Sequence, residues 1–435
     1  MPCIPHLDPK YEPHRHMLSF AEFAMILLII SLHIHGVGVI ELHGLSIAPW
    51  DWTILILASF WLLSKLASQK KIRINKSLRP ALILALIFTM WLGICTLYSP
   101  EPMRALTMFF LQIRNLILFV FIGALFSNRI SFESLNRKLL VLGFLIAAIA
   151  VIMYLAAWFK YEEILLSVSL WKPGIAYNLD QGGALRLMGF AGDPNFYSLW
   201  IALPLFISFT KSISIKHIII TTIIGLSVAM AMSRGFIGSV LISTIFLLGS
   251  MIILKTRSKE YLSRLTTGAS IVAMFIIILN FLIDYDLSQY VRRIQLATDT
   301  PRWETWSQLL TNMNEEWNPI GGIGLRGIEA ALGGEYSHNS YLDVLVETGL
   351  VGFIIWALLL AYVTIVALKK LKRPELQPWI HTWLVLLIMY GAFSLAYTPF
   401  PWLLAAILVA SDMNSPSDKL YMYEDAVIEL RGFHE

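Results

Sequence analysis

The residues of this sequence best suited to chemistry are two arginines and a histidine, each in a short polar cluster. Arg234 lies in Ser-Arg-Gly, Arg302 opens Arg-Trp-Glu-Thr-Trp, and His338 opens His-Asn-Ser-Tyr. A guanidinium group binds phosphate oxygens through two parallel hydrogen bonds. An imidazole, with an ordinary pKa of about 6.5, is suited to remove a proton at neutral pH. Together the clusters indicate a phosphate-bearing ligand and a general base.

Each cluster also has a simpler interpretation. Arg234 could snorkel to the membrane interface, but its small neighbours leave room for an anion, which we favour. A spacing of four places Arg302 and Trp306 on one face of a helix lying at the interface, where Trp303 and Trp306 are best interpreted as aromatic anchors. His338, as a lone histidine, could be an ordinary polar residue.

An earlier cluster reads Arg186-Leu-Met-Gly, then Gly-Asp193-Pro-Asn195. Asp193 before proline predicts a helix N-cap with Pro194 at the first helical position. This structural interpretation leaves Arg186 and Asn195 unexplained, and both would lie at the mouth of a helical bundle. A helix N-terminus at an outer membrane surface is also suited to bind an anion.

Other polar residues near these clusters are candidates for binding the ligand or orienting His338. Two glutamates could each orient the histidine, and their spacing does not choose between them. Two adjacent arginines could substitute for Arg302. The candidate binding residues are therefore Arg186, Asp193, Asn195, Arg292, Arg293, Glu335, Asn339, Tyr341 and Glu347.

The composition indicates a membrane protein. Of 435 residues, 57% are hydrophobic and only 14% are charged, whereas soluble domains average about 25% charged residues.

The two cysteines, Cys3 and Cys95, are expected at different depths and form no metal-binding pattern. No acidic pair suited to a metal, phosphate-binding glycine loop or nucleophile elbow is present. The first apolar run is interpreted as a retained span rather than a cleaved signal peptide.

A run of about 17 to 25 apolar residues can cross a bilayer. We therefore expect an all-α polytopic membrane protein with about twelve transmembrane helices and a long extracytoplasmic loop bearing short helices. The predicted spans are 17–39, 51–67, 80–98, 105–126, 139–159, 195–210, 217–232, 235–254, 266–283, 349–368, 379–397 and 402–412.

The orientation follows from the distribution of lysine and arginine. Every even-numbered gap between predicted spans is basic, which predicts that those gaps and both termini are cytoplasmic. The two long gaps, about 160–195 and 284–348, then face the other side. We expect a single transmembrane domain, 1–413, followed by a cytoplasmic tail, 414–435.

One arginine falls inside a predicted span. Arg114 in 105–126 needs a counter-ion or a water-filled cavity. Glu22 in the first span is a possible counter-ion. We favour structural pairing of Arg114 over a place in a transport path.

The order of these motifs resembles the O-antigen ligase and polymerase superfamily of bacterial envelope glycosyltransferases. The resemblance covers about residues 180 to 365 and rests on the four clusters above. It also rests on two glycine-containing segments, Pro319-Ile-Gly-Gly-Ile-Gly324 and Glu347-Thr-Gly-Leu-Val-Gly352.

The resemblance implies a multi-span α-helical enzyme of the bacterial inner membrane with its active site on the periplasmic face. Its donor would be a glycan on undecaprenyl pyrophosphate, and no metal, nucleotide or other cofactor would be needed. Ligases pass the glycan to the lipid A core of lipopolysaccharide. By motif, Arg234 and Arg302 would hold the pyrophosphate and His338 would be the base, with inversion at the anomeric carbon.

Alternatives remain open at this point. The segment from Arg302 to His338 is short for a ligase that must enclose a core oligosaccharide, so a repeat-unit polymerase is the rival within the family. A transporter for a lipid-linked sugar, with Arg114 and Glu22 along its path, is the rival from another class. A purely structural membrane scaffold would leave the outer arginines unexplained.

Overall fold

The computed structural model describes the larger part of the 435-residue chain. The described residues are 20–34, 40–42, 45–69, 72, 74–127, 130–158, 177–179, 185–210, 214–255, 263–270, 273–274, 302–316, 318–333 and 337–411. Of the candidate site residues, Arg292, Arg293 and Glu335 lie outside these ranges, as does the expected tail, 414–435.

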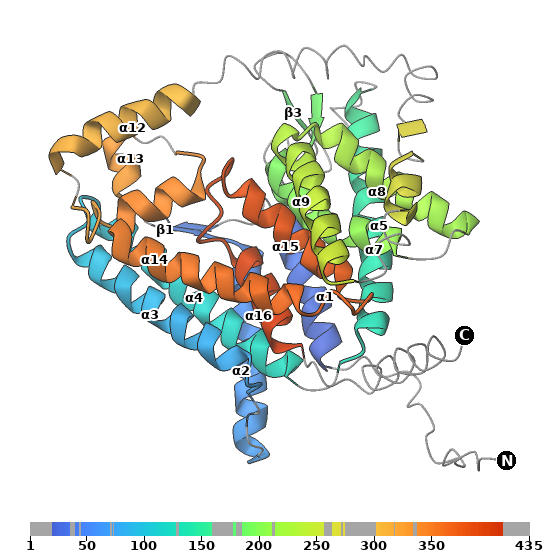
Figure 1. Ribbon diagram of the computed structural model, residues 1–435, viewed down its shortest axis with the longest axis horizontal. Coiled ribbons are helices and arrows are strands. Elements are labelled where there is room, and N and C mark those ends of the chain that lie inside the picture. Colours follow the sequence, from blue (N-terminus) through green and yellow to red (C-terminus); the bar gives the residue numbers. More distant parts are fainter. Residues whose placement is uncertain are drawn as a thin grey trace.

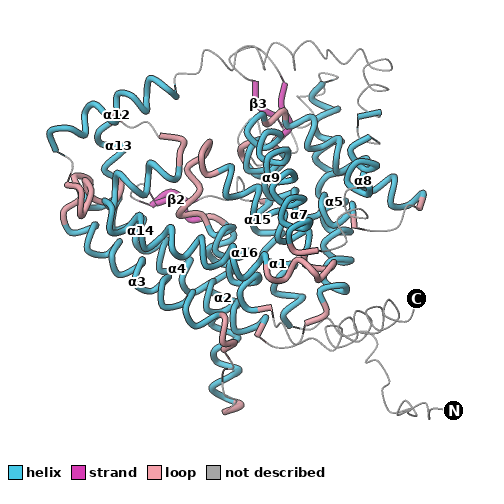
Figure 2. The backbone as a smooth tube through the Cα atoms, in the orientation of Figure 1, coloured by secondary structure: helices cyan, strands magenta, loops and turns pink. Residues whose placement is uncertain are grey.

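Helices account for most of the described structure (Figure 2). They are α1 (Phe20–His33), α2 (Pro49–Ala67), α3 (Leu78–Leu97), α4 (Pro102–Phe126), α5 (Phe132–Trp158), α7 (Pro194–Phe209), α8 (Ile215–Ala231), α9 (Arg234–Ile253), α12 (Arg302–Glu316), α13 (Gly327–Ala331), α14 (Ser340–Leu368), α15 (Gln377–Met389) and α16 (Pro399–Ala410). A short 3-10 helix, Gly189–Ala191, precedes α7.

Two short antiparallel hairpins accompany the helices. β1 (Ile40–Leu42) pairs with β2 (Leu45–Ile47). β3 (Tyr177–Leu179) pairs with β4 (Leu185–Leu187), with Asn178 opposite Arg186. The second hairpin therefore delivers Arg186 to the start of the segment that leads into α7.

The helices pack in two groups (Figure 1). In the first group, α3 packs against α4 and α14, and α16 packs against α4 and α14. In the second group, α5 and α7 pack against α8 and against each other. α15 joins the groups because it contacts α16 in one and α7 and α9 in the other.

The apolar character of the helices agrees with a polytopic membrane protein. Six helices are long and apolar enough to cross a membrane, namely α2, α3, α4, α5, α9 and α14. α1, α7, α8, α15 and α16 are apolar but shorter. The total of twelve spans stays a prediction, because the expected span 266–283 lies largely outside the described residues.

One predicted span is wrong at its C-terminal end. The span expected at 379–397 contains α15, which ends at Met389, and residues 390–398 form turns before α16 begins at Pro399. Gly391 and the Thr398–Pro399 pair flank this interruption, and both are residue types that break helices. The predicted span is therefore a short helix followed by a turn, and not one helix as far as residue 397.

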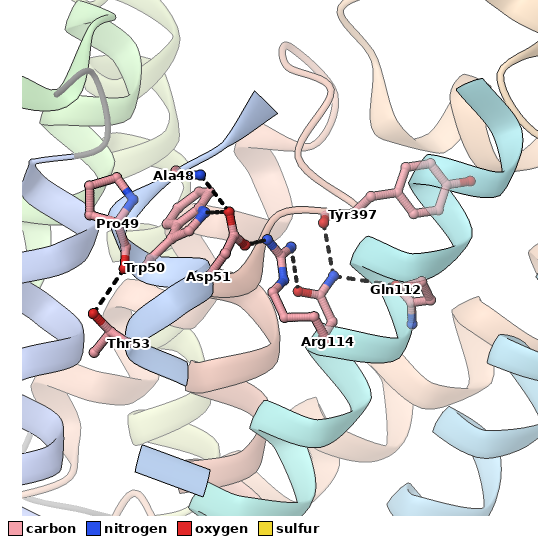
Figure 3. A network of polar contacts seen from close by, with 9 residues as sticks. Ala48, Pro49, Trp50, Asp51, Thr53, Gln112, Arg114 and Tyr397 are labelled. Carbon is pink, nitrogen blue, oxygen red and sulfur yellow. Dashed lines mark hydrogen bonds and ion pairs between the residues drawn. The ribbon is translucent and has the colours of Figure 1, made fainter. Parts of the chain in front are cut away.

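Arg114 has a buried partner, as the structural interpretation expected. Its guanidinium forms an ion pair with Asp51 in the first turn of α2, and both side chains are about 7% exposed. The other oxygen of Asp51 accepts hydrogen bonds from the backbone of Ala48, at 2.7 Å, and from the indole of Trp50, at 3.0 Å. Figure 3 shows the carboxylate between these donors and the guanidinium.

The same network continues toward the α15–α16 turn. Arg114 donates to Asn115 at 2.9 Å, and Asn115 donates to the backbone carbonyl of Tyr397 at 2.8 Å (Figure 3). The suggested counter-ion Glu22 is wrong, because its carboxylate pairs with Lys138 at 2.8 Å. Asp51, at the start of α2, is the residue that actually reaches Arg114.

We predict that Asp51→Ala lowers the free energy of unfolding by about 3–5 kcal/mol, because it leaves a buried guanidinium without its counter-charge. Unfolding of the purified protein in detergent, followed against temperature or denaturant, measures this. The control is Glu133→Ala, which removes an exposed ion pair with Arg137 and should cost less than about 1 kcal/mol.

The double variant Asp51→Leu with Arg114→Met removes both charges and should recover part of the lost stability. A double variant as unstable as Asp51→Ala would show that the unpaired charge is not the cause.

Candidate functional site

The turn between α15 and α16 is the point at which the site residues meet. Its carbonyl groups have no helical partners, so they accept hydrogen bonds from other elements. Ser340, the first residue of α14, donates to Phe393 through its hydroxyl, at 2.6 Å, and to Tyr390 through its backbone, at 2.8 Å. The Ser340 hydroxyl also accepts from the backbone of Leu395 at 2.7 Å. The start of α14 is thereby fixed on this turn.

Arg302 reaches the same turn from α12. Its guanidinium donates to the carbonyl of Ala392 at 3.1 Å and lies over the ring of Phe393, 5.4 Å from the ring centre. Trp306, one helical turn later, donates its indole N–H to the carbonyl of Ser337 at 2.7 Å. The expectation that Arg302 and Trp306 share one helical face is confirmed.

The two tryptophans of α12 differ in their environment. Trp303 is 73% exposed, as expected of an interface anchor. Trp306 is half-buried and binds the residue before His338. Trp306 therefore docks α12 on the histidine turn, a contact that the interpretation as an interface anchor did not include.

Arg234, the first residue of α9, lies close to Arg302. The N-terminus of α9 approaches the α15–α16 turn, because a Cβ added to Gly235 would lie 2.9 Å from the Phe393 ring. The pKa of Arg302 is lowered, first by burial and then by the positive charge of Arg234, while Asp193 raises it. Two guanidinium groups from different helices thus share one electrostatic environment.

The earlier cluster joins this site through Ser233, the N-cap of α9. Its hydroxyl donates to the side-chain carbonyl of Asn195 at 2.8 Å. Buried Arg186 donates to that same oxygen at 3.4 Å and to the carbonyl of Ala231 at 3.1 Å. Asn195 thereby connects the start of α7 with the start of α9, and Arg186 connects Asn195 with the end of α8.

The predicted N-cap is confirmed. The Asp193 carboxylate accepts hydrogen bonds from the backbone of Asn195, at 2.7 Å, and of Phe196, at 3.1 Å, and Pro194 is the first residue of α7. The starts of α7, α9 and α14 are therefore linked in space through Asn195, Ser233 and the α15–α16 turn. The N-terminal ends of helices carry partial positive charge, so their gathering favours an anion.

His338 lies at a sharp turn before α14. Its φ of 54° is in the left-handed region, and its side chain is exposed. Asn339 caps α14 by accepting backbone hydrogen bonds from Tyr341, at 3.0 Å, and Leu342, at 3.2 Å. The turn places the imidazole outside the helix while its neighbours are fixed.

Two of the predicted site residues, Tyr341 and Glu347, make their side-chain hydrogen bonds inside the helical bundle. The Tyr341 hydroxyl donates to the carbonyl of Leu387 in α15 at 2.7 Å, so this side chain packs into the bundle. Glu347 is 4% exposed and accepts from the Tyr397 hydroxyl at 3.2 Å. Glu335 lies outside the described residues, so orientation of His338 by this glutamate stays a prediction.

The glycine-containing segments explain how α14 is placed. The helix is interrupted at Gly349, with φ 64° and ψ −173°. The carbonyls of Val346 and Glu347, which lose their helical partners there, accept from Ile323, at 3.0 Å, and Gly324, at 3.1 Å. On the far side, Leu350 and Val351 donate to Pro319 and Ile320. The loop Asn318–Gly324 thus binds both sides of the interruption.

Three features of the site were missed from the sequence. They are Ser337, Asp343 and the α15–α16 turn. Gly391 and Thr398–Pro399 within an apolar run were the signal for the turn. Asp343 resembles an ordinary acidic residue in the first turns of a helix, and only its hydrogen bond from Ser337 distinguishes it.

Within the described part of the chain, no group of three His, Cys, Asp or Glu side chains is arranged to hold a metal ion.

Comparison with known protein families decides the identity of the central segment. The family model described as O-antigen ligase matches residues 219–357. Residues 219–357 are an O-antigen ligase domain. The ligase domain contains Arg234, Arg302 and His338, so the resemblance inferred from the sequence is confirmed for this segment. No curated protein matches the sequence.

The O-antigen ligase family, whose model matches residues 219–357, consists of glycosyltransferase-type enzymes. Lipid-linked glycans are the substrates of the family in general. Arg186, Asp193 and Asn195 precede the matched stretch; Asn195 contacts Ser233 in it, and Arg186 contacts Ala231. The neighbouring helix α7 therefore contributes side chains to the surroundings of the arginine pair.

We predict that Gly349→Ala destabilises the ligase domain. With φ 64° and ψ −173°, Gly349 has a backbone conformation that is essentially restricted to glycine and costs other residues about 1–3 kcal/mol. The new Cβ would also lie 2.3 Å from the carbonyl oxygen of Ile320. The thermal midpoint in detergent should fall. The matched control is Gly238→Ala in α9, where a Cβ meets nothing within 4 Å and the midpoint should hold or rise. Equal midpoints for the two variants would contradict this account of the Gly349 interruption.

Proposed function

We propose that the protein is an inner-membrane glycosyltransferase of the O-antigen ligase type. It transfers a glycan from undecaprenyl pyrophosphate to an acceptor hydroxyl on the lipid A core of lipopolysaccharide. The membership of residues 219–357 in the O-antigen ligase family supports this assignment. The apolar helices that surround the site provide the setting that a lipid-linked donor requires.

The observation that carries the proposal is the pair of guanidinium groups on α9 and α12. The start of α9, at Gly235, and the guanidinium of Arg302 both lie against the ring of Phe393. Burial first, and then the charge of Arg234, lowers the pKa of Arg302, so two like charges are held near each other. A pyrophosphate would turn this repulsion into attraction and would be bound through the forked geometry of both groups. Charge develops on the pyrophosphate as it leaves, so the same contacts strengthen in the transition state.

His338 is proposed as the general base. The acceptor hydroxyl oxygen attacks the anomeric carbon, and its proton passes to the imidazole of His338. The bond between the anomeric carbon and the pyrophosphate oxygen breaks, and undecaprenyl pyrophosphate leaves with both electrons of that bond. Attack from the face opposite the leaving group inverts the anomeric configuration. The exposed position of His338 leaves it accessible to an incoming acceptor.

The proposed location is the bacterial inner membrane, with the site on the periplasmic face and both termini in the cytoplasm. The basic gaps between the apolar segments support this orientation. The transporter alternative receives no support from Arg114 and Glu22. Each has a separate partner, Asp51 and Lys138 respectively.

We predict that Arg234→Lys and Arg302→Lys each lower kcat for transfer at least about tenfold, because lysine cannot reproduce a two-pronged contact with pyrophosphate. Purified protein with lipid-linked glycan and acceptor measures this. Arg137→Lys, at an exposed position, is the control and should keep wild-type activity. Wild-type transfer by either lysine variant at the site would argue against the proposed clamp.

We predict that His338→Ala abolishes transfer while the protein stays folded. The reaction is run without added metal or nucleotide, with a chelator present, and with either lipid A core or a lipid-linked repeat unit as acceptor. Transfer of one whole chain to the core identifies a ligase, whereas lengthening of the lipid-linked chain identifies a polymerase. Unchanged transfer by His338→Ala would remove this residue as the base.

A further inference from the structure

The backbone at His338 has a conformation that needs support. A φ of 54° lies in the left-handed region, which costs a residue with a side chain about 1–2 kcal/mol. The two serines that flank the turn, Ser337 and Ser340, are 1% and 0% exposed, whereas the His338 side chain is exposed. The turn is therefore held at both sides and presents the imidazole between the two fixed points.

Ser337 supplies the fixed point on the N-terminal side. Its hydroxyl donates to a carboxylate oxygen of Asp343, one turn into α14, and accepts from the backbone N–H of Asn339 at 2.9 Å. The bond from Asn339 closes a ring across His338, because Ser337 and Asn339 are its immediate neighbours, and the bond to Asp343 ties this ring to α14. The Ser337 carbonyl is engaged as well, since Trp306 donates to it at 2.7 Å.

The carboxylate of Asp343 is buried next to the turn that carries His338. It is 8% exposed, and burial of a carboxylate is costly unless hydrogen bonds compensate it. The carboxylate accepts a hydrogen bond from the hydroxyl of Ser337, within the histidine turn, and Ser394 of the α15–α16 turn also interacts with it. A charged acceptor makes this bond stronger than a neutral one would. The buried carboxylate thus holds the Ser337 hydroxyl, which in turn accepts a hydrogen bond from the backbone next to His338.

We propose that Asp343 is a positioning residue for His338 and acts through the hydroxyl of Ser337. The inference rests on the proposed function, in which His338 is the base. Asp343 holds Ser337, Ser337 holds the amide of Asn339, and the left-handed turn between them aims the imidazole at the acceptor hydroxyl. Neither Asp343 nor Ser337 contacts the donor or acceptor in this scheme. Their effect is on the rate of the chemical step and not on donor binding.

The test measures kcat and KM for the lipid-linked donor with four variants. Ser337→Ala and Asp343→Ala should each lower kcat about 10- to 100-fold, the size of effect expected when a reacting group is misplaced by about 1 Å. The KM for donor should change less than about threefold. Ser337→Thr keeps the hydroxyl and should restore most of the activity. The double variant should be no worse than the poorer single variant, because the two residues act as one unit.

The matched control is Ser208→Ala in α7. Its buried hydroxyl donates to the carbonyl of Leu205 in its own helix, so its removal costs one buried hydrogen bond at the end of α7 away from Asp193. Its kcat should equal that of the wild type. Ser337→Ala changes only one atom, and thermal midpoints of all variants identify any that are unfolded. If Asp343→Ala is unfolded, Asp343→Asn replaces it and should give an intermediate kcat, because its amide oxygen still accepts.

The experiment separates failure of the positioning role from failure of the proposed glycosyltransferase function. An inactive wild type would overturn the function itself. An active wild type with an inactive His338→Ala and a fully active Ser337→Ala would overturn the role of the Ser337–Asp343 pair. Losses in the single variants that multiply in the double variant would show independent effects and would also overturn it.

Discussion

Backbone polar groups inside an apolar surrounding must find hydrogen-bond partners, and the site depends on this constraint. The turn between α15 and α16 separates two short apolar helices, and some of its carbonyl groups have no hydrogen-bond donor within either helix. Arg302 donates to Ala392, Ser340 to Phe393, and Asn115 to Tyr397. The side chains that satisfy this turn come from α12, α14 and α4. Satisfying one irregular segment therefore brings the elements of the candidate site together.

The same constraint determines how charge is arranged. Arg114, in the middle of α4, is neutralised by Asp51 and is linked through Asn115 to the α15–α16 turn. Arg302 and Arg234, by contrast, are held close enough for their charges to interact unfavourably. Asp193 is the nearby acidic residue that acts on Arg302 in the opposite sense, because its charge favours the charged guanidinium. Both kinds of arginine thus lie near the α15–α16 turn, Arg302 by a direct hydrogen bond and Arg114 through Asn115.

Local sequence signals predicted the features that depend on neighbouring residues. The Asp193 cap, the shared face of Arg302 and Trp306, and the apolar helices follow from spacings of one to four residues. Features that depend on distant contacts were missed. Asp51 is 63 residues from Arg114, and the apolar run hid the turn at Gly391. The span predicted at 349–368 starts at the glycine that interrupts α14. The helix itself begins earlier, at Ser340.

The loop that binds both sides of Gly349 also determines where the chain can change its length. Asn318–Gly324 is tied to Val346–Val351, and Trp306 is tied to Ser337, so added residues within these segments would disturb α14 or α12. Between them, Gly333 has a left-handed backbone, and a Cβ there would meet nothing within 4 Å. Extra residues at this position would leave the contacts of Asn318–Gly324 and of Ser337 unchanged. The same position is suited to insertion of an epitope or a fluorescent label.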